Sequence, residues 1–155
     1  MIAADRAGDK PGLEIETYFD GKTRAWGIFQ DRFGKLRRQF TVDILGRRDG
    51  ADFVLDEDFV YGDGATERRV WRIRSLGLGR YEGRTEDVIG VASGTVTGDV
   101  LNWRYAMRLK VGARTLRVFF DDWMFLLPDG VLLNRARVSK WGVRLGEVTL
   151  AFRKL

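Results

Sequence analysis

Apolar and polar residues alternate along this chain from about residue 23 to the C-terminus. A period of two places successive side chains on opposite faces of an extended backbone, which indicates strands and not helices. Asp-Gly pairs such as Asp63-Gly64 and Asp129-Gly130 interrupt the alternating stretches. Tight hairpin turns favour these pairs because glycine adopts positive φ at little cost. The pattern therefore predicts a series of antiparallel hairpins.

Ten strands are predicted in this way, at residues 23–30, 36–44, 53–61, 66–74, 81–88, 90–97, 100–110, 115–127, 131–140 and 146–153. Consecutive hairpins laid side by side leave two unpaired edges unless the last strand returns to the first. We therefore expect an all-β fold, namely a single antiparallel up-and-down β-barrel of about ten strands.

The first twenty residues do not share this pattern. Residues 1–12 are small and polar, which predicts a flexible arm, and residues 13–19 predict a short helix or strand lying across one end of the barrel. A chain of 155 residues is long enough for one core. We therefore expect a single barrel domain over residues 13–155.

The composition excludes most catalytic chemistry, because the chain contains no His and no Cys. A Ser-His-Asp triad, a thiol nucleophile, a structural zinc site and a haem held by His or Cys all need those residues. Carboxylates and tyrosines remain as candidate acid-base groups. We expect no cofactor and no metal.

The net charge of +5 arises from 27 basic and 22 acidic residues. Their signs alternate through residues 67–86, which predicts solvated strand faces with cross-strand pairs, and we expect no nucleic-acid partner. No apolar stretch is long enough to span a bilayer, which leaves peripheral membrane contact and the oligomeric state open. Without the apolar segment of a signal peptide, the chain as written predicts a cytoplasmic protein, or a periplasmic or envelope-associated one if a leader has been removed.

Strand parity identifies polar residues that share a face with apolar ones. Glu57, Arg69 and Asp122 each interrupt an otherwise apolar face, and Trp26, Trp71 and Trp103 are predicted to be buried on the inner wall. The candidate ligand-binding residues are Trp26, Phe29, Glu57, Phe59, Arg69, Trp71, Trp103, Tyr105, Phe120 and Asp122.

Two interpretations of Arg69 follow from its inward position. The first is a structural ion pair with Glu57 or Asp122, since an inward guanidinium without a partner would cost several kcal/mol. The second is a contact with a ligand carboxylate or phosphate, with Glu57 and Asp122 holding the guanidinium. Asp56, Glu57 and Asp58 cannot converge on one cation because strand alternation turns the middle carboxylate away from its neighbours.

Several stretches resemble a proteobacterial family of unknown function, DUF family 3833, many members of which are described as lipoproteins. The resemblance covers nearly the whole chain from Leu13 onward, and it rests on residues 26–34, 56–59, 67–71, 102–105, 120–124 and 139–142. It implies a lipocalin-like or calycin-like barrel, in agreement with the strand count. The chain lacks the lipobox Cys of the lipoprotein members, so the resemblance does not extend to a lipid anchor.

Three function classes remain. The first is a barrel that binds a small apolar or amphipathic molecule, such as a fatty acyl chain, inside its aromatic wall. The second is an enzyme (an isomerase, hydratase or hydrolase of a lipid or polyketide-like substrate) in which Glu57, Asp122 and Tyr105 perform acid-base chemistry. The third is a structural or partner-binding module with a filled barrel. A cavity of a few hundred Å³ would separate the first two from the third.

Overall fold

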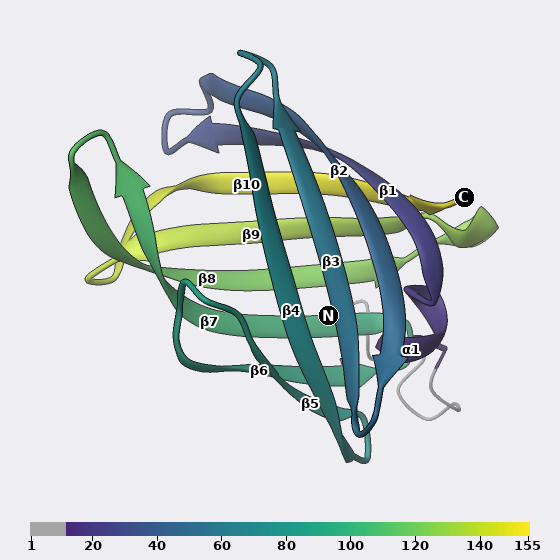
Figure 1. Cartoon of the computed structure of the whole chain (residues 1–155). Helices are drawn as coiled ribbons and strands as arrows, with labels where there is room; N and C mark the ends of the chain where they lie inside the picture. The colour runs from purple at the N-terminus through teal and green to yellow at the C-terminus, as the bar shows by residue number, and fades with distance from the viewer. Residues whose placement is uncertain (1–11) are drawn as a thin grey trace.

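Ten antiparallel strands close into one barrel in the computed structural model, which describes residues 12–155 (Figure 1). The strands are β1 (Gly21–Asp31), β2 (Leu36–Asp49), β3 (Asp52–Tyr61), β4 (Thr66–Gly77), β5 (Arg80–Arg84), β6 (Val88–Thr97), β7 (Val100–Val111), β8 (Arg114–Leu126), β9 (Leu132–Lys140) and β10 (Val143–Lys154). The fold class predicted from the alternation is confirmed. The flexible arm expected over residues 1–12 lies outside the described residues except for Gly12.

Each strand pairs with its neighbours in the sequence, and β1 pairs with β10 to close the sheet. The hairpin turns therefore fall alternately at the two ends of the barrel. One end, which we call the mouth, consists of the turns at residues 32–35, 62–65, 85–87, 112–113 and 141–142. At the Asp-Gly turn of the mouth, Gly64 has a φ of 88°, as the sequence pattern requires.

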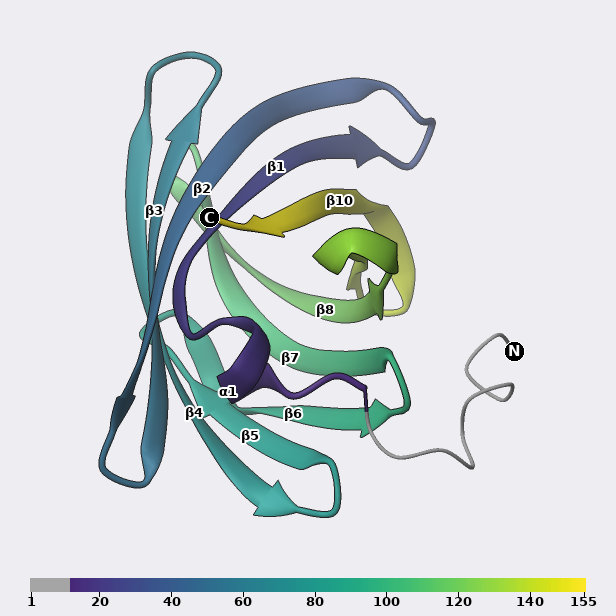
Figure 2. The ribbon, with the colours of Figure 1, turned by 90° about the vertical axis from the view of Figure 1, so that its right-hand side faces the viewer.

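The end opposite the mouth is closed by α1 (Ile15–Tyr18), a single helical turn that lies across the barrel (Figure 2). Leu13, Ile15 and Phe19 are buried. The hydroxyl of Tyr18 donates a hydrogen bond to the carbonyl oxygen of Gly130, at 2.6 Å, which holds the turn against the loop between β8 and β9. The predicted short element is thus a helix, and it plugs this end.

Two predicted strands are wrong in their extent: β2 continues to Asp49, beyond the predicted end at residue 44, and the strand predicted at residues 81–88 is too long. The sequence pattern extends from residue 81 to 88, whereas β5 ends at Arg84 and Val88 begins β6. The turn between them uses Thr85, Glu86 and Asp87, where the Val88 N–H donates to the Thr85 carbonyl. No glycine or proline marks this turn, so the sequence gives no break signal.

No helix within residues 12–155 is long and apolar enough to cross a bilayer.

Candidate ligand-binding cavity

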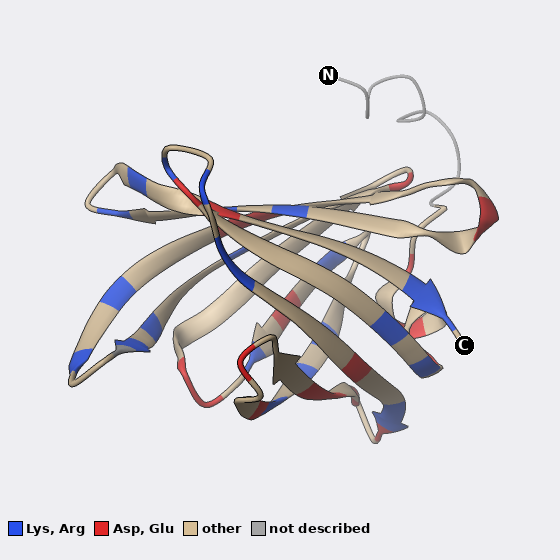
Figure 3. Ribbon diagram, turned by 90° about the horizontal axis from the view of Figure 1, so that it is seen from above, with Lys and Arg blue, Asp and Glu red and all other residues tan. Residues whose placement is uncertain are grey.

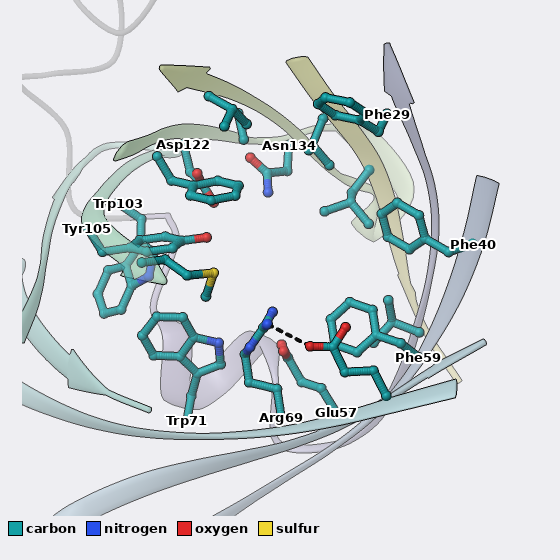
Figure 4. Close-up of a pocket in the computed structure, with 18 of the residues that line it drawn as sticks. Phe29, Phe40, Glu57, Phe59, Arg69, Trp71, Trp103, Tyr105, Asp122 and Asn134 are labelled. Carbon is teal, nitrogen blue, oxygen red and sulfur yellow. Dashed lines mark hydrogen bonds and ion pairs between the residues drawn. The ribbon is translucent and has the colours of Figure 1, made fainter. Parts of the chain in front are cut away.

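The barrel encloses a cavity of about 580 Å³, within the range of small-molecule sites. Figure 4 shows its aromatic and polar side chains arranged around an open lumen. Ile15 and Phe19 of the N-terminal plug form its floor, and the lining extends to the exposed Arg37, Arg38 and Lys110 near the mouth. The cavity therefore runs along the barrel from a closed apolar end to a charged rim.

Aromatic rings form one continuous side of the lumen. Trp71 packs edge to face against Trp103 and Tyr105, with ring centroids 5.6 and 5.3 Å apart, and Tyr105 stacks on Phe120 at 5.0 Å. These geometries are favourable for aromatic pairs. The predicted inward positions of Trp71 and Trp103, which are 7% and 5% exposed, are confirmed.

Two strand glycines hold Trp103 flat against the barrel wall. A Cβ atom at Gly94 would lie 2.5 Å from the indole Cε3, and one at Gly83 would lie 2.6 Å from Cζ2. The indole therefore occupies the space that side chains on β5 and β6 would fill elsewhere. This arrangement keeps the largest side chain of the wall out of the lumen.

Trp26 lies on the outer face of β1, so its predicted place on the inner wall is wrong. It is 47% exposed, and the Arg24 guanidinium lies 5.9 Å from its ring centroid. The inward neighbours of Trp26 on β1, Ala25 and Gly27, are small, and a Cβ at Gly27 would lie 2.5 Å from Phe40 and 2.7 Å from Leu150. Side chains from β2 and β10 thus fill the space over this part of β1, and Trp26 lies on the outer face.

The three predicted phenylalanines, Phe29, Phe59 and Phe120, line the cavity and are partly buried. Phe40, which is not among the predicted ligand-binding residues, lines the cavity beside Phe59, and their ring centroids are 6.0 Å apart. Phe59 in turn stacks on Tyr61 at 6.1 Å. A second aromatic cluster thus lies on the β2–β3 side of the lumen.

Arg69 lines the cavity but does not pair with Glu57 or Asp122 as predicted. Its guanidinium donates to Glu67, two residues earlier on β4, at 2.9 Å, and lies 3.8 Å from Asp87. Glu67 also accepts a hydrogen bond from the Tyr61 hydroxyl at 2.7 Å. Glu67 and Asp87 therefore balance the positive charge of Arg69 near the mouth. Glu57 does not pair with Arg69, although it lies directly opposite it in the strand register.

Burial leaves two carboxyl groups of the lumen with raised pKa values. Desolvation raises the pKa of Glu57 to about 7, against the opposing effect of the Arg69 charge. Desolvation likewise raises the pKa of Asp122 to about 8, and the side-chain amide of Asn134 offsets part of this shift. At pH 7 Asp122 is therefore mostly protonated and can donate a hydrogen bond or a proton. The pKa of the neighbouring Tyr105 is also raised, mainly by burial and then by Asp122.

Two oxygen atoms in the lumen lack a protein partner. Within residues 12–155, the Oδ1 atoms of Asp122 and Asn134 are buried without a hydrogen bond, and both side chains point into the lumen in Figure 4. Buried polar atoms nearly always have a partner, so these two call for water or a ligand group. The inward parity of Leu132, Asn134 and Ala136 could have identified Asn134 from the sequence.

Three basic residues of the rim were missed by strand parity. Arg37 and Arg38 are consecutive, yet both line the cavity. The register of β1 with β2 shifts between Phe29 and Gln30, and this irregularity breaks the alternation of β2 at these residues. Arg38 lies 3.5 Å above the Tyr61 ring centroid, and Lys110 completes the basic part of the rim from β7.

Within the described residues, no group of three or more Asp or Glu side chains could hold a metal ion.

The barrel resembles a solved structure, the S-type phycobiliprotein lyase CPES from Guillardia theta, with a TM-score of 0.67 over 97% of this chain and 96% of that one. At 8% sequence identity the likeness concerns the fold alone. No curated protein matches the chain. A protein-family model described as a protein of unknown function matches residues 1–154, and the chain therefore belongs to the DUF3833 family.

Proposed function

We propose that this protein binds one small amphipathic molecule with an extended apolar part, of the fatty acyl type, inside the barrel. The observation that carries the proposal is the cavity of about 580 Å³ with its aromatic wall. Small barrels either fill their interior with side chains or hold one small ligand there. An open apolar lumen of ligand size therefore argues against the filled-barrel alternative.

The lumen also supports an orientation for the ligand. Its floor near Ile15 and Phe19 is apolar, whereas Arg37, Arg38 and Lys110 stand at the mouth end. The apolar part would lie along Trp71, Trp103 and the phenylalanines, and an anionic head group would face the basic rim. Arg69 and Arg37 are less available for this role than Arg38 and Lys110, because Glu67 and Asp31 already accept their hydrogen bonds.

The fold likeness is consistent with this proposal. The neighbour's name describes a phycobiliprotein lyase, and at 8% identity its likeness carries the fold and not the ligand. The type of ligand in the present chain is therefore argued from its own lining, which is apolar and aromatic with an arginine-rich rim.

One observation favours a second candidate, an enzyme with carboxylate acid-base chemistry. Asp122 is 5% exposed, and no arginine or lysine of residues 12–155 contributes to the shift of its pKa to about 8. A neutral buried carboxyl beside Tyr105 could donate a proton to a bound substrate. This candidate predicts that the protein turns over an acyl substrate. If the turnover disappears in Asp122→Asn while ligand binding persists, the enzyme is favoured over simple binding.

A chain-length titration tests the binding proposal. Saturated fatty acids of increasing length are added while the intrinsic Trp emission is followed, because Trp71 and Trp103 line the lumen. Each added CH₂ should tighten binding by up to about fourfold, since its burial contributes ~0.8 kcal/mol, until the lumen is full. If no chain length binds with a dissociation constant below ~100 μM, the fatty acyl proposal fails.

A matched pair of arginine variants tests the orientation. Arg38→Gln should weaken the binding of a fatty acid several-fold and leave the binding of the corresponding fatty alcohol unchanged, because only the acid carries a carboxylate. Arg24→Gln, which removes an arginine from the outer face where it pairs with Asp43, is the control and should affect neither ligand. Equal weakening of acid and alcohol by Arg38→Gln would contradict the proposed head-group position.

A further inference from the structure

The mouth of the barrel carries a strongly uneven charge. Residues 31–38, 108–117 and 140–144 form the tips of the β1–β2, β7–β8 and β9–β10 hairpins, and they contain ten Lys or Arg residues against one acidic residue, Asp31. The strand order β2-β1-β10-β9-β8-β7 makes these hairpins consecutive around the barrel. We call these three tips the basic face. In Figure 3 blue bands predominate at the left-hand end of the ribbon, where these hairpins lie.

The rest of the mouth differs in charge. The tips of the β3–β4 and β5–β6 hairpins, residues 61–69 and 84–88, contain three basic and four acidic residues. The excess of positive charge is therefore confined to one side of the mouth. A partner that recognises this side must be negatively charged.

Large apolar side chains project from the same hairpins. Phe33 is 81% exposed at the β1–β2 tip, and Trp141 is 91% exposed at the β9–β10 tip. Leu36 and Val143, beside them in sequence, are 46% and 52% exposed. The strands β1 and β10 that carry these tips pair directly, with Asp31 opposite Gly146 at the mouth. The two aromatic side chains therefore stand at neighbouring positions of one end.

The backbone of Trp141 gives no structural reason for a tryptophan. Its φ is 52° and that of Gly142 is 77°, so both central residues of this two-residue hairpin turn have positive φ. Such a turn favours Asn, Asp or Gly at both positions. A tryptophan here is unfavourable for the backbone and makes little contact with the core, and such outliers are retained at functional sites.

We propose that the basic face docks on the surface of a lipid bilayer that contains anionic lipids, with Phe33 and Trp141 entering the interfacial region. Basic residues close to an anionic leaflet are attracted to it, and aromatic side chains such as Trp favour the boundary between head groups and acyl chains. The lysine and arginine residues at these tips flank the exposed aromatic rings, as in Lys140, whose Nζ lies 4.4 Å from the Trp141 centroid. This proposal does not depend on what the cavity holds.

The opposite end of the barrel provides a matched contrast. Leu78, in the β4–β5 turn, is fully exposed and also has a positive φ, of 57°. Charges of both signs lie at that end: Asp99 and Asp129 are in its turns, Asp49 and Asp52 flank the β2–β3 turn, and Arg74 and Arg80 flank the β4–β5 turn. Exposure and backbone conformation are thus similar at Leu78 and Trp141, whereas the α1 end carries both signs of charge and the basic face has only one acidic residue.

Sedimentation with vesicles tests the proposal. The wild-type protein is expected to bind vesicles of equal parts phosphatidylglycerol and phosphatidylcholine, to bind pure phosphatidylcholine much more weakly, and to be released by high salt. Trp141→Asn should lower the partition coefficient about tenfold or more, because a large apolar side chain is lost from the contact. Since asparagine suits the turn, this variant should unfold at the same or a higher denaturant concentration than the wild type. Leu78→Asn is the control and should leave vesicle binding unchanged.

Charge reversal at the two ends separates the basic face from the net charge. The triple variant Lys35→Glu, Arg114→Glu and Arg144→Glu changes one exposed residue on each tip, none of which lines the cavity, and it should abolish vesicle binding. The triple variant Lys22→Glu, Arg48→Glu and Arg153→Glu makes the same change in charge toward the α1 end and should retain binding.

Four results would overturn the proposal. Equal losses in the two triple variants would show that only net charge matters. A loss in Leu78→Asn as large as that in Trp141→Asn would place the contact at the wrong end. If the wild type does not bind vesicles at low salt, docking is excluded. If it binds single-stranded nucleic acid and not vesicles, the basic face belongs to that partner.

Discussion

Replacing Asp122 by asparagine is expected to raise the free energy of unfolding at pH 8 by about 3–6 kcal/mol and to leave it nearly unchanged at pH 4. In the folded protein burial holds the pKa of Asp122 at about 8, against 3.8 for an ordinary aspartate. The difference of about four pKa units corresponds to ~1.4 kcal/mol each. Asparagine has nearly the same shape and never ionises, so it removes this contribution.

The direction of the pH dependence follows from the raised pKa. Well below the ordinary pKa of 3.8 the carboxyl is protonated in both the folded and the unfolded chain and has no effect on their balance. Between about pH 4 and 8 the unfolded chain loses this proton while the folded chain retains it, so the wild type becomes less stable as the pH rises. The pKa of Glu57, raised to about 7, adds to the same trend. Urea unfolding at several pH values measures both effects.

Asp121→Asn is the matched control for this prediction. Asp121 lies next in sequence, accepts a hydrogen bond from Asn102 at 2.8 Å and lies 3.7 Å from Arg104. Its replacement removes favourable contacts and also one charge that raises the pKa of Asp122, so we expect at most a much smaller gain at pH 8 than in Asp122→Asn. If the wild type is equally stable at pH 5 and pH 8, and Asp122→Asn does not raise the free energy of unfolding, then Asp122 is solvated through the lumen.

The second large effect is expected at Gly94. Alanine at this position places a Cβ 2.5 Å from the Trp103 ring, so the indole must move toward the lumen. We expect a loss of about 1–3 kcal/mol in the free energy of unfolding, the usual cost of overpacking a core. Weaker fatty acid binding should accompany this loss, because the displaced ring occupies part of the cavity.

A double-mutant cycle identifies the cause of this loss. Trp103→Leu removes the ring that Gly94→Ala would displace, so the double variant should lose less stability than the two single losses combined, by about 0.5–3 kcal/mol. Gly62→Ala is the control, because the nearest atom to a Cβ there lies at 3.6 Å. If the stability losses of Gly94→Ala and Trp103→Leu simply add up in the double variant, the contact between residue 94 and the Trp103 ring does not determine the loss caused by Gly94→Ala.

The sequence alone predicts most of the fold, because its information lies in local periodicity. Alternation and Asp-Gly turns identify all ten strands, and parity places Glu57, Trp71, Trp103 and Asp122 on the inner face. These predictions need only the geometry of a single strand. The closed order of strands then follows from the need to remove unpaired edges.

The wrong predictions concern contacts between strands. Trp26 lies outside because Phe40 and Leu150 occupy the space over Gly27, which the sequence of β1 does not reveal. Arg69 pairs with Glu67 on its own strand although Glu57 faces it on β3, a choice set by side-chain conformation and not by register.

The basic rim and the open lumen were likewise beyond the sequence pattern. Arg37 and Arg38 both line the cavity beside a register shift between β1 and β2, which strand parity does not reveal. Trp103 lies flat on Gly83 and Gly94, whereas a ring turned inward would occupy part of the lumen. An aromatic composition is compatible with either arrangement.

Native mass spectrometry of protein purified gently from its native host tests the central claim, that the barrel binds a small molecule, most directly. The wild type is expected to retain one small molecule per chain. Ala136→Phe, which adds a ring to the lumen from a residue that is now 2% exposed, is expected to be free of it. A ligand-free wild type, or an equal amount of retained molecule in Ala136→Phe, would contradict the account.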